Sequence, residues 1–314
     1  MLLLAIDIGG TKHSVALVNE KGQIVKKKTG ATKRSGGAEW MIERVLGSAG
    51  AIIGTNVVSS CGIGFGGPVD FVAQKVLSST HVPGWENVAL AAVVEDKLGV
   101  PTVVENDANA GALGEFTFGA GRGCSHMVYY TISTGIGGGI VLDGQIYRGG
   151  NGNAGELGHI AVNDRGPQCD CGNRGCLEAL CSGKSIGRRA TDQVRQYPRR
   201  GRCLRQMANG DQVDAKTVFD AARSGDPLAS EIVAETCRYL GMGLAAAMNT
   251  LAPQRIVIGG GVGKAGRVLF EPLRRQVARF TMPVHRPYLH IVPAQRKDNS
   301  VLLGAAALAT HLFC

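Results

Sequence analysis

Short apolar and alternating runs in the first third of the chain have the pattern of strands. The run LLLAIDI is followed by the alternating run HSVALVN and, after a turn at EKG, by QIVKKKT, which predicts a hairpin meander. Helical periodicity at about 39–50, 88–99 and 107–117 is interleaved with strand patterns at 60–65 and 101–105. This alternation predicts an α/β fold.

The opening pattern returns in the middle of the chain. The stretch HMVYYTISTGIGGGIVLDGQIY, at 126–147, again reads as strand, glycine turn, strand, polar turn and strand, which indicates an internal duplication. A helix-rich stretch follows at 177–251, and then the strand RIVIGG, another helix, the strand LHIVP and a last apolar helix, SVLLGAAALATHLF. We expect Ser300 to cap that last helix.

Length and composition set the class of protein. With 314 residues, 44% hydrophobic and 19% charged, the chain can bury a substantial core and is expected to form two domains. No apolar run approaches the roughly 20 residues that cross a bilayer, and the start lacks the basic region of a signal peptide. Nine cysteines, an odd number, argue against a disulfide scaffold. We therefore expect a cytoplasmic protein with no membrane partner.

The positive charge is concentrated in one stretch. The net charge is +9, and seven arginines lie between Arg188 and Arg205. No aromatic ladder, heptad or helix-turn-helix pattern accompanies them, so a solvated helix end and loop is the first interpretation and attraction of anions the second.

Glycine is the compositional anomaly, because 46 residues is roughly twice the usual share of about 7%. The glycines cluster after apolar runs, where we expect turns whose backbone N–H groups can bind phosphate. The P-loop pattern is absent, since the first glycine position before Gly183-Lys184-Ser185 holds Glu178. Two G-x-G-x-x-G matches begin at Gly62 and Gly261, but neither opens the first βαβ unit. A nicotinamide enzyme is therefore disfavoured.

Two carboxylates suggest phosphoryl transfer. Asp7 in DIGGTK would repel a phosphate unless a cation lay between them, which implies Mg²⁺, unless Asp7 only caps its own turn. Lys12 or Thr134 could then touch the terminal phosphate. Asp107 follows Asn106 where a strand ends and a helix begins; it is either a helix cap or the base that accepts a hydroxyl proton.

A cysteine cluster suggests a metal. Cys169, Cys171 and Cys176 lie across two glycine turns, and His159 comes ten positions earlier. Three thiolates and one imidazole suit tetrahedral Zn²⁺, and four protein ligands make such a site structural. Buried, unligated cysteines beside a satisfied histidine are the alternative.

These motifs together resemble one family. DIGGTK, STGIGGG, GELGH and CDCGNRGCLE, in this order, resemble the ROK family (repressors, open reading frames and sugar kinases) of the actin-like ATPase, or ribonuclease H-like, fold. The resemblance implies two α/β domains with a cleft, which we expect at 1–105 plus 299–314 and at 106–298. It also implies ATP, Mg²⁺, structural Zn²⁺, a hexose substrate and a homodimer or higher homo-oligomer.

The resemblance also assigns residues. Asp107 matches the catalytic base, and the sugar contacts are expected at Gly67, Asn106, Asp107, Glu156, His159 and Glu178. The expected nucleotide contacts are Asp7, Gly9, Gly10, Thr11, Lys12, Thr134, Gly135, Gly137, Gly138, Gly260 and Gly261. The expected zinc ligands are His159, Cys169, Cys171 and Cys176.

Within the family the sequence favours a glucokinase. ROK repressors carry an N-terminal winged helix-turn-helix, whereas this chain begins on the first expected strand, so we expect no nucleic-acid partner. Pro68 replaces the arginine typical of N-acetylmannosamine kinases, and the loop HVPGWEN at 81–87 is similar to that of ROK glucokinases. The alternatives are a kinase for fructose, mannose or an N-acetylated amino sugar, a polyphosphate-using kinase, a partner-controlled ATPase and a non-enzymatic sugar-responsive regulator.

Overall fold

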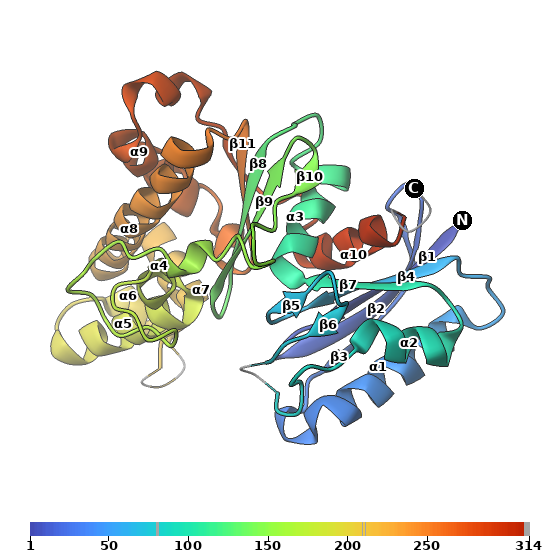
Figure 1. Ribbon diagram of the computed structural model, residues 1–314. Helices are drawn as coiled ribbons and strands as arrows, with labels where there is room; N and C mark the ends of the chain where they lie inside the picture. Colours follow the sequence, from blue (N-terminus) through green and yellow to red (C-terminus); the bar gives the residue numbers. More distant parts are fainter. Residues whose placement is uncertain (80–81, 209, 211, 311–314) are drawn as a thin grey trace. The chain divides into compact units, whose positions relative to one another are not determined.

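The computed structural model describes residues 1–79, 82–208, 210 and 212–310 (Figure 1). The first residue of the expected loop 81–87 and the end of the expected C-terminal helix and domain, 311–314, lie outside the described residues. The strands are β1 (Leu2–Ile8), β2 (Lys12–Asn19), β3 (Ile24–Ala31), β4 (Ser60–Phe65), β5 (Val69–Asp70), β6 (Lys75–Val76), β7 (Thr102–Asn106), β8 (Met127–Ile132), β9 (Ile136–Leu142), β10 (Gln145–Ile146), β11 (Arg255–Gly259) and β12 (Ile291–Pro293). The α-helices are α1 (Gly37–Ile53), α2 (Leu90–Leu98), α3 (Asp107–Phe118), α4 (Leu177–Cys181), α5 (Gly183–Gln196), α6 (Arg202–Met207), α7 (Ala215–Arg223), α8 (Pro227–Leu251), α9 (Arg267–Phe280) and α10 (Ser300–Thr310). Short 3₁₀ helices are η1 (Arg34–Gly36), η2 (Leu157–His159), η3 (Val262–Ala265), η4 (Pro283–Tyr288) and η5 (Lys297–Asn299).

Two five-stranded sheets share one topology. Their strand orders are β3-β2-β1-β4-β7 and β10-β9-β8-β11-β12, and a small hairpin pairs β5 with β6. In the first sheet β1, β2 and β3 form an antiparallel meander, and β4 and β7 are added in parallel. In the second, β11 lies parallel to β8 and β12 parallel to β11. The duplication predicted at 126–147 is confirmed by this correspondence, and so is the α/β class.

The chain forms two compact units. The first contains 1–124, 139–155 and 295–314, and the second contains 125–138 and 156–294. The units therefore divide the chain at other places than the boundaries expected at 105/106 and 298/299: α3 and β10 belong to the first unit.

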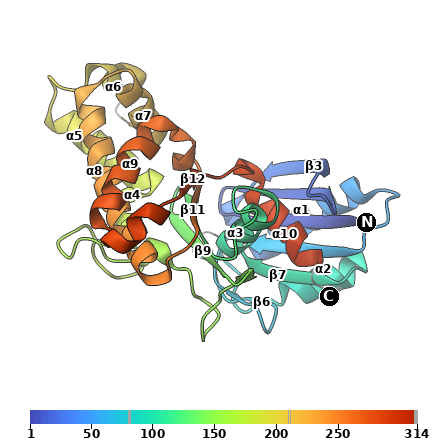
Figure 2. The same ribbon diagram turned by 90° about the horizontal axis from the view of Figure 1, so that it is seen from above.

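Helices cover both faces of the first sheet: Figure 1 shows α3 and α10 on one face and α1 and α2 on the other, and Figure 2 looks onto the face that carries α3 and α10. Leu4 and Ile6 of β1 pack in one buried cluster with Met41 of α1. Leu3 and Ala5, which point to the opposite face because side chains alternate along a strand, pack with Ala305 of α10. β1 is therefore buried on both faces, as its continuous apolar run predicts.

Glycines allow α3 and α10 to cross at close range. A Cβ atom at Gly304 would lie 1.6 Å from the carbonyl oxygen of Ala110, and one at Gly114 would lie 2.1 Å from that of Ser300. A Cβ at Gly62, inside β4, would lie 1.8 Å from the carbonyl oxygen of Ala305. Gly62 lies in the strand predicted at 60–65, and its lack of a side chain makes room for α10.

The predicted cap at Ser300 is wrong. Ser300 has helical backbone angles, and its hydroxyl donates a hydrogen bond to Oε1 of Glu115 at 2.7 Å. The fully buried Glu115 carboxylate also accepts the backbone N–H groups of Ala120, Gln295 and Arg296. A buried carboxylate needs such donors, so Glu115 joins α3 to the start of α10.

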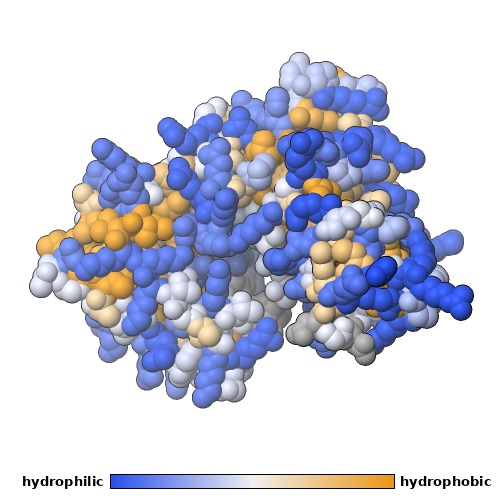
Figure 3. All heavy atoms as spheres, turned by 180° about the vertical axis from the view of Figure 1, so that it is seen from behind, coloured by the Kyte–Doolittle hydropathy of each residue, from blue (hydrophilic) through white to orange (hydrophobic). Residues whose placement is uncertain are grey.

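In the second unit α8 packs against α4, α7 and α9 (Figure 1). Asp226 caps α8 by accepting the N–H of Ala229, and Pro227 occupies its first turn. No helix in the described part of the chain is long and apolar enough to cross a membrane. Hydrophilic residues predominate on the face seen in Figure 3.

The arginine-rich stretch runs over α5 and α6, where several guanidinium groups are used within the fold. Arg205 donates to the carbonyl oxygens of Val194 and Tyr197, and Arg200 pairs with Glu231. The stretch therefore lies on a helix end and a loop, as the first interpretation predicts, and attraction of anions stays a prediction.

Candidate active site

The end of β7 places Asn106 and Asp107 at the start of α3. Asn106 is the N-cap: its Oδ1 accepts the backbone N–H groups of Ala108 and Asn109 at 2.9 and 3.2 Å. Its Nδ2 donates to the carbonyl oxygen of Gly67 at 3.0 Å, and its second Nδ2 hydrogen has no partner among the described hydrogen bonds. The capping role therefore belongs to Asn106, and Asp107 is the first helical residue.

The carboxylate of Asp107 lies beside the turn that follows β1. A Cβ atom built on Gly66 would be 3.4 Å from Oδ2 of Asp107 and 3.5 Å from Cα of Gly9. The N–H of Gly66 donates to the carbonyl oxygen of Ile8 at 2.8 Å, which holds the ends of β1 and β4 together. Gly67 also admits no side chain, since its Cβ would lie 2.8 Å from the carbonyl oxygen of Ser78.

The first glycine turn, Gly9 to Lys12, is closed by its own backbone: the N–H of Gly9 donates to the carbonyl oxygen of Lys12 at 3.0 Å. Asp7, which precedes it on β1, is 9% exposed. Burial raises the pKa of the Asp7 carboxyl to about 6, although the ammonium groups of Lys12 and Lys27 act to lower it. A buried carboxylate of this kind fits a divalent cation, because a hard cation prefers oxygen ligands and would offset the cost of its charge.

The second glycine turn, Ser133 to Gly135, joins β8 to β9 and is held by groups from the helical part of the second unit. Gly137 and Gly138, which were expected at the nucleotide, lie in the first part of β9. The N–H of Gly183 donates to the carbonyl oxygen of Ser133 at 2.6 Å, and the N–H of Ile136 donates to Oε2 of Glu178 at 2.6 Å. A Cβ at Gly135 would lie 2.4 Å from that same carboxylate oxygen. The structure therefore places Glu178, expected at the sugar, directly against the second phosphate loop.

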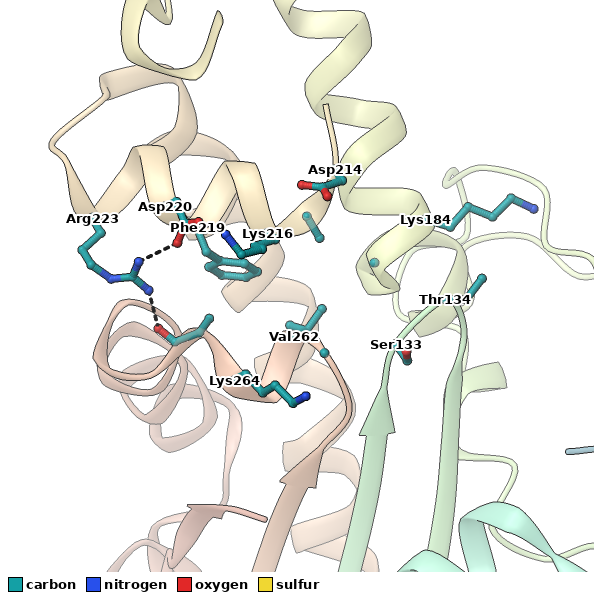
Figure 4. Close-up of a pocket in the computed structure, with 14 residues that line it drawn as sticks. Ser133, Thr134, Lys184, Asp214, Lys216, Phe219, Asp220, Arg223, Val262 and Lys264 are labelled. Carbon is teal, nitrogen blue, oxygen red and sulfur yellow. Dashed lines mark hydrogen bonds and ion pairs between the residues drawn. The ribbon is translucent and has the colours of Figure 1, made fainter. Parts of the chain in front are cut away.

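A cavity of about 540 Å³ opens beside this turn (Figure 4). Its lining residues are Ser133, Thr134, Gly183, Lys184, Asp214, Ala215, Lys216, Phe219, Asp220, Arg223, Gly261, Val262, Lys264 and Ala265. Thr134 and Gly261 were expected at the nucleotide. Gly260, the residue before, has φ 78°, and a Cβ there would lie 2.3 Å from the carbonyl oxygen of Ile132. The cavity has the size of a small-molecule site and a surplus of cationic side chains.

Sequence reasoning missed the wall of this cavity that α7 contributes. Asp214 caps α7 by accepting the N–H of Thr217, and Phe219 and Asp220 follow on the helix. Arg223 pairs with Asp220 and also donates to the carbonyl oxygen of Ala265 (Figure 4). No motif marks these residues, because an amphipathic helix with polar residues reads the same whether it lines a pocket or faces water.

The predicted metal ligands come together. One ligand atom from each of His159, Cys169, Cys171 and Cys176 lies within 4.8 Å of all the others. The Sγ atoms of Cys171 and Cys176 are 3.6 Å apart, and Sγ of Cys169 is 3.6 Å from Nδ1 of His159. A tetrahedral zinc ion would set these separations at about 3.8 and 3.5 Å, given Zn–S and Zn–N distances of about 2.3 and 2.0 Å.

The three thiols of this cluster differ in acidity, and the ring of His159 is oriented by a carboxylate. A hydrogen bond from the backbone N–H of Asn173 lowers the pKa of the Cys171 thiol to about 7, whereas burial raises the pKa of Cys169 and raises that of Cys176 to about 12. Nε2 of His159, the ring nitrogen opposite the cluster, is 3.8 Å from Oε2 of Glu156. His159 can therefore bind a metal through Nδ1 while a carboxylate orients its ring.

Comparison with known proteins decides the family. A model of the ROK family matches residues 3–311. This chain belongs to the ROK family. A relative named glucokinase from Thermotoga maritima is 38% identical over 306 residues, which cover 98% of this chain and 96% of the relative.

Solved structures of ROK proteins have the same fold. A ROK family glucokinase from Streptomyces griseus, in complex with glucose and AMPPNP, matches with a TM-score of 0.88 and 35% identity and covers 99% of this chain and 100% of that one. A ROK hexokinase from Thermus thermophilus matches with a TM-score of 0.80 and 32% identity and covers 100% and 99%. The predicted actin-like ATPase fold is thereby confirmed for this ROK protein.

Proposed function

We propose that this ROK protein phosphorylates the 6-hydroxyl of a hexose with ATP, and that its substrate is glucose. The observation that carries the proposal is the position of Asp107, whose carboxylate lies beside the first glycine turn at Gly9. A base must be close to the phosphate that its substrate hydroxyl attacks. The relatives named glucokinase support glucose as the acceptor.

In the proposed reaction Asp107 orients the 6-hydroxyl and accepts its proton. Asn106 supports the same substrate through the Nδ2 hydrogen that Gly67 does not use. The backbone N–H groups of Gly10, Thr11, Gly135, Gly137 and Gly138 and the side chains of Lys12 and Thr134 bind the phosphates. Asp7 would hold Mg²⁺, which when bound would offset the charge that develops on the transferred phosphoryl group. The cavity beside Thr134 and Gly261 takes the nucleoside.

Zinc has a structural role in this proposal. His159, Cys169, Cys171 and Cys176 would fill its coordination shell, so no open position remains to activate water. Glu156, His159 and Glu178 lie on or beside the segments that the ligands fix and are proposed sugar contacts. We also propose that the protein is a homo-oligomer that binds neither DNA nor membranes. We propose that it is located in the cytoplasm, where its thiols stay reduced.

The test is a substrate panel with purified protein. ADP formation is followed with ATP and Mg²⁺ and with glucose, fructose, mannose, N-acetylglucosamine or N-acetylmannosamine, and the product is examined by phosphorus NMR. We expect glucose to give the highest kcat/KM and glucose 6-phosphate to be formed. Preference for another hexose would replace glucose by that sugar, whereas ADP formation without sugar dependence, or none at all, would favour a regulator or a partner-controlled ATPase.

Asp107→Asn tests the assignment of the base. The amide keeps the size of the side chain but cannot accept the proton, so we expect kcat to fall by roughly 10²–10⁴ while glucose affinity stays within a few-fold. Turnover near the wild-type value would remove Asp107 from this role.

A further inference from the structure

Glu105, the residue before Asn106, forms an ion pair with Arg148, and no sequence motif indicates this pair. Nε and Nη2 of Arg148 are 2.8 and 2.7 Å from Oε2 of Glu105. The Glu105 side chain is 2% exposed and that of Arg148 is 25% exposed. A carboxylate buried this deeply is retained only with strong partners, and here two guanidinium nitrogens donate to one oxygen, Oε2, which holds that oxygen and compensates its charge.

The other oxygen of Glu105 acts on the site. Oε1 accepts the backbone N–H of Asn106 at 2.9 Å and Nδ2 of Asn109 at 3.1 Å. Asn106 is the cap of α3, and the next residue is Asp107. Arg148 holds Oε2 and leaves Oε1 to the Asn106 and Asn109 donors, so the contacts at the two oxygens together fix the orientation of the carboxylate.

Arg148 itself is held in place on two sides. Its guanidinium carbon lies 3.5 Å from the centre of the Phe71 ring, a stacking contact that a lysine cannot reproduce. Its carbonyl oxygen accepts the N–H of Ala154 at 3.0 Å, which closes the glycine-rich loop leading to Glu156. The same residue therefore stabilises that loop through its backbone and the end of β7 through its side chain.

We propose that Arg148 is a positioning residue for phosphoryl transfer: with Glu105 it fixes the backbone at Asn106 so that Asn106 and Asp107 present their side chains to the sugar. The inference rests on the proposed function of these two residues. Arg148 does not touch the substrate in this scheme. Its effect reaches the sugar through Glu105 and leaves the phosphate loops, whose hydrogen bonds involve other residues, unchanged.

Steady-state kinetics of R148M and R148K, with glucose and ATP varied in turn, test the inference. A shift of the reacting groups by a fraction of an ångström to about 1 Å can cost up to about 10² in rate. We expect R148M to lower kcat by at least about tenfold and to raise the glucose KM by about fivefold or more, with the ATP KM within about twofold of wild type. R148K keeps the charge but neither the two guanidinium contacts with Glu105 nor the stack, so its values should be intermediate.

The control variant is R200M, which breaks the exposed Arg200–Glu231 pair in the second unit and should leave all three constants unchanged. Each variant is assayed well below its own melting temperature. If Arg148 only stabilised the fold, R148M would lose active protein, and kcat would fall with both KM values unchanged; this result, or wild-type kinetics, overturns the inference. If R148M does not fold, R148K alone tests the inference. Wild-type kinetic constants in R148K would then refute a role for the two guanidinium contacts with Glu105. Absence of hexose phosphorylation by the wild type would instead contradict the proposed function.

Discussion

Glu178 links the segment that holds the predicted zinc ligands to the second phosphate loop, and its removal should weaken nucleotide binding. Glu178→Ala deletes the acceptor of the Ile136 N–H, which now donates to Oε2 at 2.6 Å. Hydrogen bonds to charged groups contribute about 1.5–3 kcal/mol net. If this energy orders the turn from Ser133 to Gly135 and the start of β9, nucleotide binding must supply the free energy of ordering in the variant. The Kd should then rise by about 10- to 100-fold.

The assay is calorimetric titration of a non-hydrolysable ATP analogue with Mg²⁺ and without sugar. Omitting the sugar separates this effect from the proposed contact of Glu178 with the hexose. Glu178→Gln keeps an oxygen acceptor without the charge, so its Kd should rise by only about fivefold. The control is Glu156→Gln, because Glu156 is 60% exposed and pairs with His159 and not with the loop. A Glu178→Ala protein that binds the analogue within twofold of wild type would refute the anchoring role.

Three further predictions concern metal, pH and packing. Purified protein should contain about one zinc per chain. After zinc is removed with a chelator, proteases should cleave the 160–176 segment before they cleave the rest of the second unit. Zinc-free protein with an unchanged cleavage pattern would contradict the assignment. Because the folded pKa of Asp7 is raised from 3.8 to about 6, the folded state binds this proton more tightly, and the free energy of unfolding should fall by about 3 kcal/mol as the pH rises through that window. The Asp7→Asn protein should therefore melt at a higher temperature than the wild type at pH 7.5 and at the same temperature near pH 4. It should also be inactive. If the two proteins melted at the same temperature at both pH values, burial would not raise the pKa of Asp7 as described. Gly304→Ala places a methyl group 1.6 Å from the carbonyl oxygen of Ala110 and should lower the free energy of unfolding by about 3 kcal/mol or more. Gly47→Ala, whose Cβ would have no atom within 4 Å, is the control and should melt at the same or a higher temperature than wild type.

Elements with a local signal were predictable from the sequence. β1 and β4 span the predicted residues because a buried strand produces an uninterrupted apolar run. The metal cluster was predictable because three of its four ligands lie within eight residues, so that two turns suffice to bring them together. The duplication was visible because strand, glycine turn and strand recur in the same order.

Features that depend on distant packing were not predictable. Ser300 has the residue type and position of a helix cap, but its hydroxyl donates to a carboxylate 185 residues away. Gly62 belongs to a glycine pattern typical of a phosphate turn, yet glycine is needed at this position because α10 packs too close for a side chain. The Glu105–Arg148 pair joins residues 43 positions apart, and although each lies next to a motif, nothing in the sequence indicates that the two side chains meet.

The contacts of the site divide by unit, and this division separates the effects of its parts. Asn106 and Asp107 are fixed by Glu105, Gly67 and the start of α3, all within the first unit. The metal ligands, Glu178 and the second phosphate loop are joined within the second unit, since Cys176 directly precedes α4 and α4 carries Glu178. Metal loss should therefore disturb nucleotide binding before it disturbs the base, and the loss of Arg148 should do the reverse. Measured together, nucleotide affinity and turnover distinguish the two kinds of damage.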